Sequence, residues 1–286
     1  MHEAWIVEAV RTPVGKFAGG LSEVRPDDLG ALVIDEVVGR AGVDPGEIEE
    51  VFLGCSNQAG EDNRDVARMS ALLAGLPLHV GGVTVNRLCG SGLEAIVEAA
   101  RAIEVGDGHA FIAGGVESMS RAPLAMAKAA RPYERGDRRV YDTALGWRFV
   151  NTKMDALGHT DTLGMTAENL VDQYSIPRGE QDEFALASHR KAVAAMNDGR
   201  FTEEIVPVET STGVVKADES PRPDTTLDKL ARLTPVFKDG GTVTAGNSSP
   251  LNDGAAALLL ASREYADRHG LRRRARVAAS MQRSSR

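Results

Sequence analysis

Residues 85–92 read Val-Asn-Arg-Leu-Cys-Gly-Ser-Gly, and this stretch decides the fold because it joins a strand to a helix. Residues 83–88 are predicted to form a buried strand, and the apolar face that recurs over residues 91–105 predicts an amphipathic helix. Two glycines allow a tight turn between them. Cys89 lies at this turn, where it meets the unpaired N–H groups and the positive dipole end of the helix, which favour a thiolate.

Cys89 is therefore the candidate nucleophile. Its position resembles a nucleophile elbow in which cysteine replaces serine. The alternative is an inert buried residue, which is the usual state of a free cysteine. The chain has only one other cysteine, Cys55, so a disulfide framework and a cysteine-based zinc site are both excluded, and a reducing, cytoplasmic location is expected. The six histidines follow no ligand spacing, so we expect no metal and assign no histidine to catalysis.

Strand and helix signals alternate around this stretch. Strands are predicted at residues 4–10, 51–53 and 110–113, and helices at residues 27–38 and 65–75. Elements that alternate at this spacing predict a layered α/β fold with a largely parallel sheet.

The pattern changes from about residue 120. Residues 121–153 carry eight lysines and arginines against three acidic residues, a balance that suits an anionic CoA phosphate, although basic loops are usually only solvated. The helices and short strands predicted beyond them cover residues 166–174, 180–197, 205–208 and 214–216. We expect residues 121–251 to form a lobe inserted into the first domain, to which the chain returns with a strand at residues 255–261.

The composition is that of a globular protein, with 286 residues of which 42% are hydrophobic and 26% charged. That length exceeds one ordinary core and predicts two domains. No apolar run approaches the roughly 18–20 residues of a membrane span, and the start lacks a secretory pattern. The formal net charge of −8 argues against nucleic acid as a partner.

Five spaced motifs are similar to those of the thiolase family, the acetyl-CoA acetyltransferases. They are colinear, and they lie at residues 7–15, 85–103, 113–120, 166–169 and 242–249. The resemblance implies a thiolase fold with an N-terminal half, a loop domain over the active site, and a C-terminal half that repeats the first. Mapped onto this chain, these parts are residues 1–120 with 252–273, the loop domain 121–251, and a stub of the C-terminal half at 274–286.

The resemblance also implies the chemistry. Thiolases cleave a 3-oxoacyl-CoA to acetyl-CoA and a shortened acyl-CoA, or run the reverse condensation, through an acyl-enzyme that here would form on Cys89. CoA is a substrate, and no cofactor is implied. By the same resemblance Ser249 contacts the pantetheine arm, Arg222 lies beside the adenine nucleotide, and Phe237 lines the CoA tunnel. The implied partners are acyl-CoA, CoA and further copies of the chain in a homodimer or homotetramer, with neither nucleic acid nor membrane.

Substrate choice stays open at this point. Residues 114–128 and 146–151 resemble thiolases that act on 3-oxoadipyl-CoA, but a short-chain 3-oxoacyl-CoA is equally compatible. Thr162 and Leu163 replace the His-Met pair of the biosynthetic members, so a different acyl pocket is expected. By resemblance Cys55 lies near a dimer interface and is structural.

The family's second half supplies a Gly-His-Pro histidine, an Asn-Glu-Ala-Phe asparagine and a Cys-x-Gly-Gly-Gly cysteine, and residues 262–286 contain none of these. Residues 281–286 resemble nothing in the family, so a truncation through a lost reading frame is expected. The alternative hypothesis is therefore a non-catalytic thiolase fragment that retains dimerisation or CoA binding. A third hypothesis is a ketoacyl synthase, which shares the fold and the position of the cysteine.

Overall fold

The computed structural model describes residues 2–281, and these form two compact units. Unit 1 comprises the described residues up to Arg121, the segment Glu203–Glu219 and the described residues from Asn252 on, and unit 2 comprises Ala122–Thr202 and Ser220–Leu251. Glu203–Glu219 therefore packs with unit 1, whereas the sequence-based division places it in the loop domain. Part of the stub expected at 274–286, residues 282–286, lies outside the described residues.

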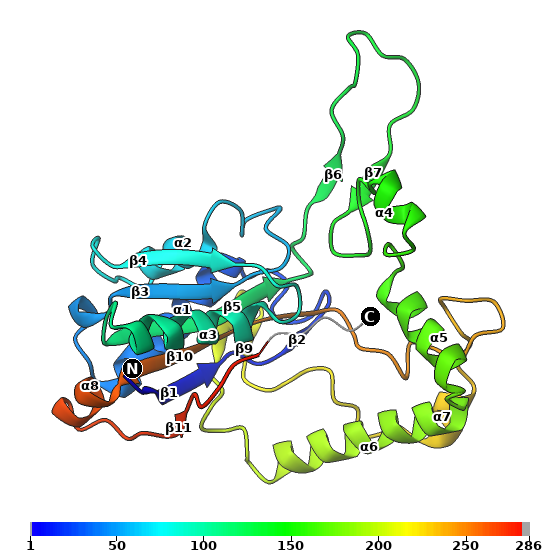
Figure 1. Cartoon of the computed structure of the whole chain (residues 1–286). Helices are drawn as coiled ribbons and strands as arrows, with labels where there is room; N and C mark the ends of the chain where they lie inside the picture. Colours follow the sequence, from blue (N-terminus) through cyan, green and yellow to red (C-terminus); the bar gives the residue numbers. More distant parts are fainter. Residues whose placement is uncertain (1, 282–286) are drawn as a thin grey trace. The chain divides into compact units, whose positions relative to one another are not determined.

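Unit 1 is built on one sheet in the order β11-β1-β10-β5-β3-β4, with β2 also paired to β10 (Figure 1). Its strands are β1 (Ala4–Arg11), β2 (Gly15–Lys16), β3 (Glu50–Gly54), β4 (Gly81–Val85), β5 (Ala110–Ser118), β10 (Asn252–Ser262) and β11 (Ala275–Arg276). A separate hairpin of this unit joins β8 (Val208–Thr210) to β9 (Gly213–Val215).

The sheet is mixed, so the prediction of a largely parallel sheet was wrong. β3 runs parallel to both β4 and β5, as the strand–helix alternation predicts. β10, however, arrives from much later in the chain and inserts between β1 and β5, antiparallel to both. Alternation along the sequence reports only on consecutive strands, so it could not reveal this neighbour.

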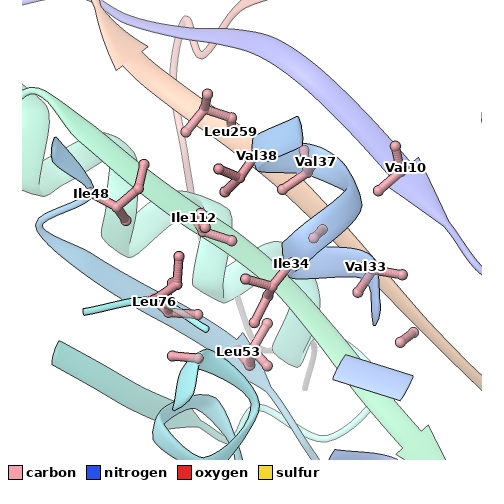
Figure 2. Close-up of a cluster of buried hydrophobic side chains, with 14 of the residues drawn as sticks. Val10, Val33, Ile34, Val37, Val38, Ile48, Leu53, Leu76, Ile112 and Leu259 are labelled. Carbon is pink, nitrogen blue, oxygen red and sulfur yellow. The ribbon is translucent and has the colours of Figure 1, made fainter. Parts of the chain in front are cut away.

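Helices cover both faces of this sheet. In unit 1 they are α1 (Pro26–Ala41), η1 (Pro45–Glu47), α2 (Val66–Leu73), α3 (Ser91–Val105) and α8 (Arg263–Arg268). Side chains alternate along each strand, so Ile112 of β5 packs with α1 and α2 in one apolar cluster while its neighbours Phe111 and Ala113 pack with α3 in another. Figure 2 shows the first cluster, in which Ile34 of α1 lies near Ile112 and Leu53, and Val38 of the same helix lies near Leu259. The result is a three-layer α/β arrangement.

β4 is an edge strand. Within the part of the chain that the structure describes it pairs only with β3, and its residues are half-buried or exposed. The expectation of a buried strand over residues 83–88 was therefore wrong, and the strand ends earlier, at Val85. Residues 86–90 are left as a turn that leads from the carboxyl end of β4 into α3.

Unit 2 is mainly helical. Its elements are β6 (Leu124–Met126), β7 (Val140–Asp142), α4 (Thr152–Ala156), α5 (Leu163–Tyr174), α6 (Arg178–Asn197) and α7 (Leu227–Ala231). The buried carboxylate of Glu168 on α5 accepts hydrogen bonds from the backbone N–H groups of Thr242 (2.8 Å) and Val243 (2.7 Å). Charge-assisted bonds of this kind fix the segment 242–249 to α5.

A search of the described helices for a run long and apolar enough to span a bilayer found none.

Candidate active site

Cys89 is exposed and lies one residue before the N-cap of α3. Gly90 occupies the N-cap position, and no side chain caps the helix there. The first turn of α3 therefore keeps backbone N–H groups and the positive end of the helix dipole available beside the cysteine. The alternative of an inert buried residue does not hold for Cys89, because its side chain reaches solvent.

The residue before the cysteine adopts an uncommon backbone conformation. Leu88 has φ +50°, in the left-handed region that disfavours a branched side chain. Its N–H donates to Oδ1 of Asn86 (2.9 Å), and its carbonyl accepts from the backbone N–H (3.0 Å) and the Oγ–H (2.6 Å) of Ser91. Several bonds thus hold a strained turn at the position that presents Cys89.

Glycines let this turn approach the sheet. A Cβ on Gly54, at the end of β3, would overlap the backbone of Ser91 and Gly92 in the first turn of α3. A Cβ on Gly115 of β5 would lie 3.0 Å from the carbonyl oxygen of Gly54 and 3.4 Å from Cα of Gly92. The start of α3 therefore rests directly on the backbone of two strands.

Cys55 has the opposite environment. It is buried, and its Sγ lies 3.8 Å from Oδ2 of Asp62. Burial, with the carboxylates of Glu117 and Asp62 close by, raises the pKa of the Cys55 thiol far above its ordinary value, and burial also raises the pKa of Asp62. Cys55 is therefore a protonated thiol at neutral pH, unsuited to nucleophilic attack.

Cys55, Asp62 and Glu117 form a group with metal-ligand spacing, since their ligand atoms lie within 4.8 Å of one another. Their hydrogen bonds account for the arrangement without an ion. Glu117 accepts from the N–H (2.8 Å) and Oγ–H (2.5 Å) of Ser56 and from the N–H of Asn57 (3.1 Å). These contacts hold the loop after β3 in place, so the role of this group is structural.

We expect the two thiols to differ in reactivity. In the native protein at pH 8, a thiol reagent should titrate one cysteine per chain, and peptide mapping should place the label on Cys89, because Cys55 is buried and protonated. In denaturant both should react. Labelling of Cys55 at a rate comparable with Cys89 in the native state would contradict this description of the site.

Arg222 lies in unit 2, at a pocket of about 220 Å³ between α6 and residues 222–225. Its backbone N–H donates to Nδ1 of His189 on α6 (3.2 Å), and its side chain is exposed. The pocket has apolar walls from Leu186 and Val193 and cationic side chains from Arg190 and Arg222. Such a lining suits a flat ring that carries phosphate groups.

Phe237 and Ser249 also belong to unit 2. The ring of Phe237 packs directly on Gly164 at the start of α5, where any Cβ would overlap it. Ser249 is exposed and follows a turn in which Oδ1 of Asn247 accepts from the backbone N–H of Thr244 (2.7 Å). The structure therefore brings Arg222, Phe237 and Ser249 into the same unit and places Cys89 in the other.

Two further features escaped the sequence analysis. The guanidinium of Arg87 forms two hydrogen bonds with the buried carboxylate of Glu94, and His189 holds the backbone of Arg222. Arg87 and Glu94 are seven residues apart across a strand–turn–helix junction, so neither the helical nor the strand period relates them. The signal that was available for His189 was its position on the apolar face of a predicted helix.

Comparison with known proteins gives a consistent result. The profile of the thiolase N-terminal domain matches residues 4–264. A beta-ketoadipyl-CoA thiolase of Pseudomonas aeruginosa is 55% identical over 282 residues, covering 96% of this chain and 70% of that protein. A 3-oxoadipyl-CoA/3-oxo-5,6-dehydrosuberyl-CoA thiolase of Escherichia coli is 51% identical over 285 residues, covering 98% and 71%.

A solved structure agrees with the fold. The crystal structure of the Bacillus anthracis acetyl-CoA acetyltransferase superposes with a TM-score of 0.86 at 43% identity, covering 96% of this chain and 69% of that one. The match includes the mixed sheet and the helices on its two faces. The chain belongs to the thiolase family of acyltransferases.

Proposed function

We propose that the chain is a thiolase for 3-oxoadipyl-CoA in which Cys89 carries the acyl group. The observation that supports this assignment most is the exposed Cys89 in a strained turn at the N-terminus of a 15-residue helix. A side chain in this position is accessible to a substrate and lies at the positive end of the helix dipole. The other cysteine, Cys55, is buried and protonated, so it cannot compete for this role.

The first half-reaction transfers the acyl group to the protein. The Sγ of Cys89 bonds to C3 of the 3-oxoacyl-CoA, the C2–C3 bond breaks, and its electron pair leaves on C2 of acetyl-CoA, which takes up the proton lost by the thiol. In the second half-reaction the sulfur of a new CoA bonds to the acyl carbon, the bond to Sγ breaks with its electron pair on Sγ, and the proton lost by the CoA thiol restores the Cys89 thiol. The backbone N–H of Cys89 contributes to stabilising the oxyanion. Two successive half-reactions give ping-pong kinetics.

Three residues of unit 2 are proposed to bind CoA. Arg222, with the pocket beside α6, takes the nucleotide end, where a guanidinium matches phosphate geometry. Phe237 provides an apolar surface for the pantetheine chain, and the exposed hydroxyl of Ser249 offers it a hydrogen bond. No cofactor beyond CoA as substrate enters this scheme.

The choice of 3-oxoadipyl-CoA as the substrate is supported by the relatives, several of which carry the name beta-ketoadipyl-CoA thiolase. The names of these relatives favour it over acetoacetyl-CoA. A cytoplasmic location and a homodimer or homotetramer are likewise proposed from the family, and light scattering of the purified protein measures the assembly.

The test is direct detection of the acyl-enzyme. The 286-residue chain is mixed with 3-oxoadipyl-CoA or acetoacetyl-CoA, quenched in acid, and weighed intact before peptide mapping. We expect the mass of one acyl group on the peptide that holds Cys89, formed faster with 3-oxoadipyl-CoA. Faster acylation by acetoacetyl-CoA would reject the substrate, and acylation confined to any other residue would reject the nucleophile.

A further inference from the structure

A bidentate ion pair joins the two ends of the turn that presents Cys89. Nε and Nη2 of Arg87 donate to the two carboxylate oxygens of Glu94 at 2.8 and 3.0 Å. Arg87 lies near the start of the turn, residues 86–90, while Glu94 lies in the first turn of α3 and is buried. A paired fork of this kind defines orientation as well as distance, which a single hydrogen bond does not.

The backbone of Arg87 is tied to α3 as well. Its N–H donates to Oγ of Ser91 (2.8 Å), and its carbonyl accepts from the N–H of Gly90 (3.1 Å). The aliphatic part of the Arg87 side chain runs beside Gly90, where an added Cβ would lie 3.8 Å from its Cγ and 3.9 Å from its Cδ. The contacts of Arg87 with Gly90, Ser91 and Glu94, called the bracket below, therefore tie Arg87 to the start of α3 across the segment Leu88–Gly90.

The strained residue, Leu88, lies in the segment that the contacts of this bracket span. Leu88, with φ +50°, is less stable in this conformation than in a right-handed one, and such a residue persists only where its surroundings over-determine it. If the bracket opens, Leu88 can relax into an ordinary conformation, and the backbone at Cys89 rotates with it. The direction of the Cys89 side chain would then no longer be defined.

We propose that the Arg87–Glu94 pair is a positioning device for the nucleophile, acting through the geometry of the turn. The inference rests on the proposed role of Cys89. The two charges of the pair neutralise each other at close range, so its main effect is on orientation and not on the field at the thiol. Acyl transfer depends on orientation, since a displacement of about 1 Å can cost on the order of 100-fold. Alkylation by a small reagent such as iodoacetamide needs only an accessible thiolate.

The experiment compares these two reactions in four variants. Arg87→Ala removes both hydrogen bonds of the pair from the buried Glu94 carboxylate, which lowers Tm. Arg87→Ala/Glu94→Ala removes both charges and should recover most of that Tm. Arg87→Lys keeps the charge with a single contact. Arg101→Ala, which breaks the exposed Arg101–Glu98 ion pair (2.8 Å) on the same helix, is the matched control.

We expect single-turnover acylation of Cys89 to fall by about 10- to 100-fold in both Arg87→Ala and the double variant, by less in Arg87→Lys, and not at all in Arg101→Ala. Iodoacetamide alkylation of Cys89 should stay within about 3-fold of wild type in all four. Recovery of acylation together with Tm in the double variant would reduce the pair to a structural role and overturn the proposal. So would an equal loss of alkylation and acylation.

The two proposals fail differently. If wild-type Cys89 is alkylated but never acylated, the proposed function is wrong. If the wild type is acylated and the double variant matches its rate, only the positioning role is wrong. Cys89→Ala supplies the background for both reactions, since Cys55 is then the sole remaining thiol.

Discussion

Cys89→Ala should lower thiolytic turnover at least about 10⁴-fold, because removal of the covalent nucleophile leaves only binding and oxyanion stabilisation. The measurement is the initial rate of acetyl-CoA formation from 3-oxoadipyl-CoA. The protein should keep its fold, since the Cys89 side chain is exposed and supports no apolar cluster. An unchanged circular dichroism spectrum and Tm would separate the loss of chemistry from a loss of structure.

Cys55→Ala is the matched control for this prediction. It removes the other thiol, which is buried in the larger apolar cluster, so it should cost on the order of 1 kcal/mol of unfolding free energy. Turnover at 25 °C should stay within a few-fold of wild type. Wild-type turnover in Cys89→Ala would show that Cys89 does not carry the acyl group. Loss of turnover in Cys55→Ala, with the fold intact, would contradict the assignment in the same way.

Gly54→Ala should strongly destabilise unit 1. The new Cβ would overlap the backbone of Ser91 and Gly92, and backbone atoms cannot move aside as the end of a flexible side chain can. We expect a loss of about 3 kcal/mol and a fall in Tm of roughly 5–10 °C, measured by thermal and denaturant unfolding. Because α3 must lift off β3, single-turnover acylation of Cys89 should fall as well.

Gly39→Ala makes the same chemical change, but we expect it to raise the stability of the protein. Gly39 lies on the exposed side of α1, and a Cβ there would have nothing within 4 Å. Alanine is the better helix former, so this variant should be stabilised by about 0.5–1 kcal/mol. If Gly54→Ala were as stable as Gly39→Ala, the close packing of α3 on the sheet described above would be contradicted.

Local features of the fold could be predicted from the sequence. The helix expected over residues 91–105 is α3, Ser91–Val105, and the strands at 4–10 and 255–261 lie within β1 and β10. These segments carry their own signal, because apolar periodicity, glycines and breakers act within a few residues. The position of Cys89 beside the N-terminus of a helix follows from the same local information.

What could not be predicted depends on distant partners. Nothing in the residues of β4 distinguishes an edge strand from a central one, since that depends on which strands pair with it. The segment 203–219 packs with unit 1 partly because Arg11 forms hydrogen bonds with Glu204 (2.7 Å) and with Asp218 (2.7 and 3.0 Å), about 200 residues away. The Arg87–Glu94 pair is short-range, but it crosses from a turn into a helix, where no periodic pattern applies.

The place of β10 in the sheet has a consequence for synthesis on the ribosome. Among the described residues β1 pairs with the strands β10 and β11 and forms one isolated bridge, from Arg11 to Ile205. Its neighbouring strands in the sheet are therefore made only after Leu251. All of unit 2 is translated in that interval. A sheet with such long-range pairing closes slowly and leaves strand edges exposed. The nascent chain should therefore depend on chaperones that bind unpaired strands until Ser262 has left the exit tunnel.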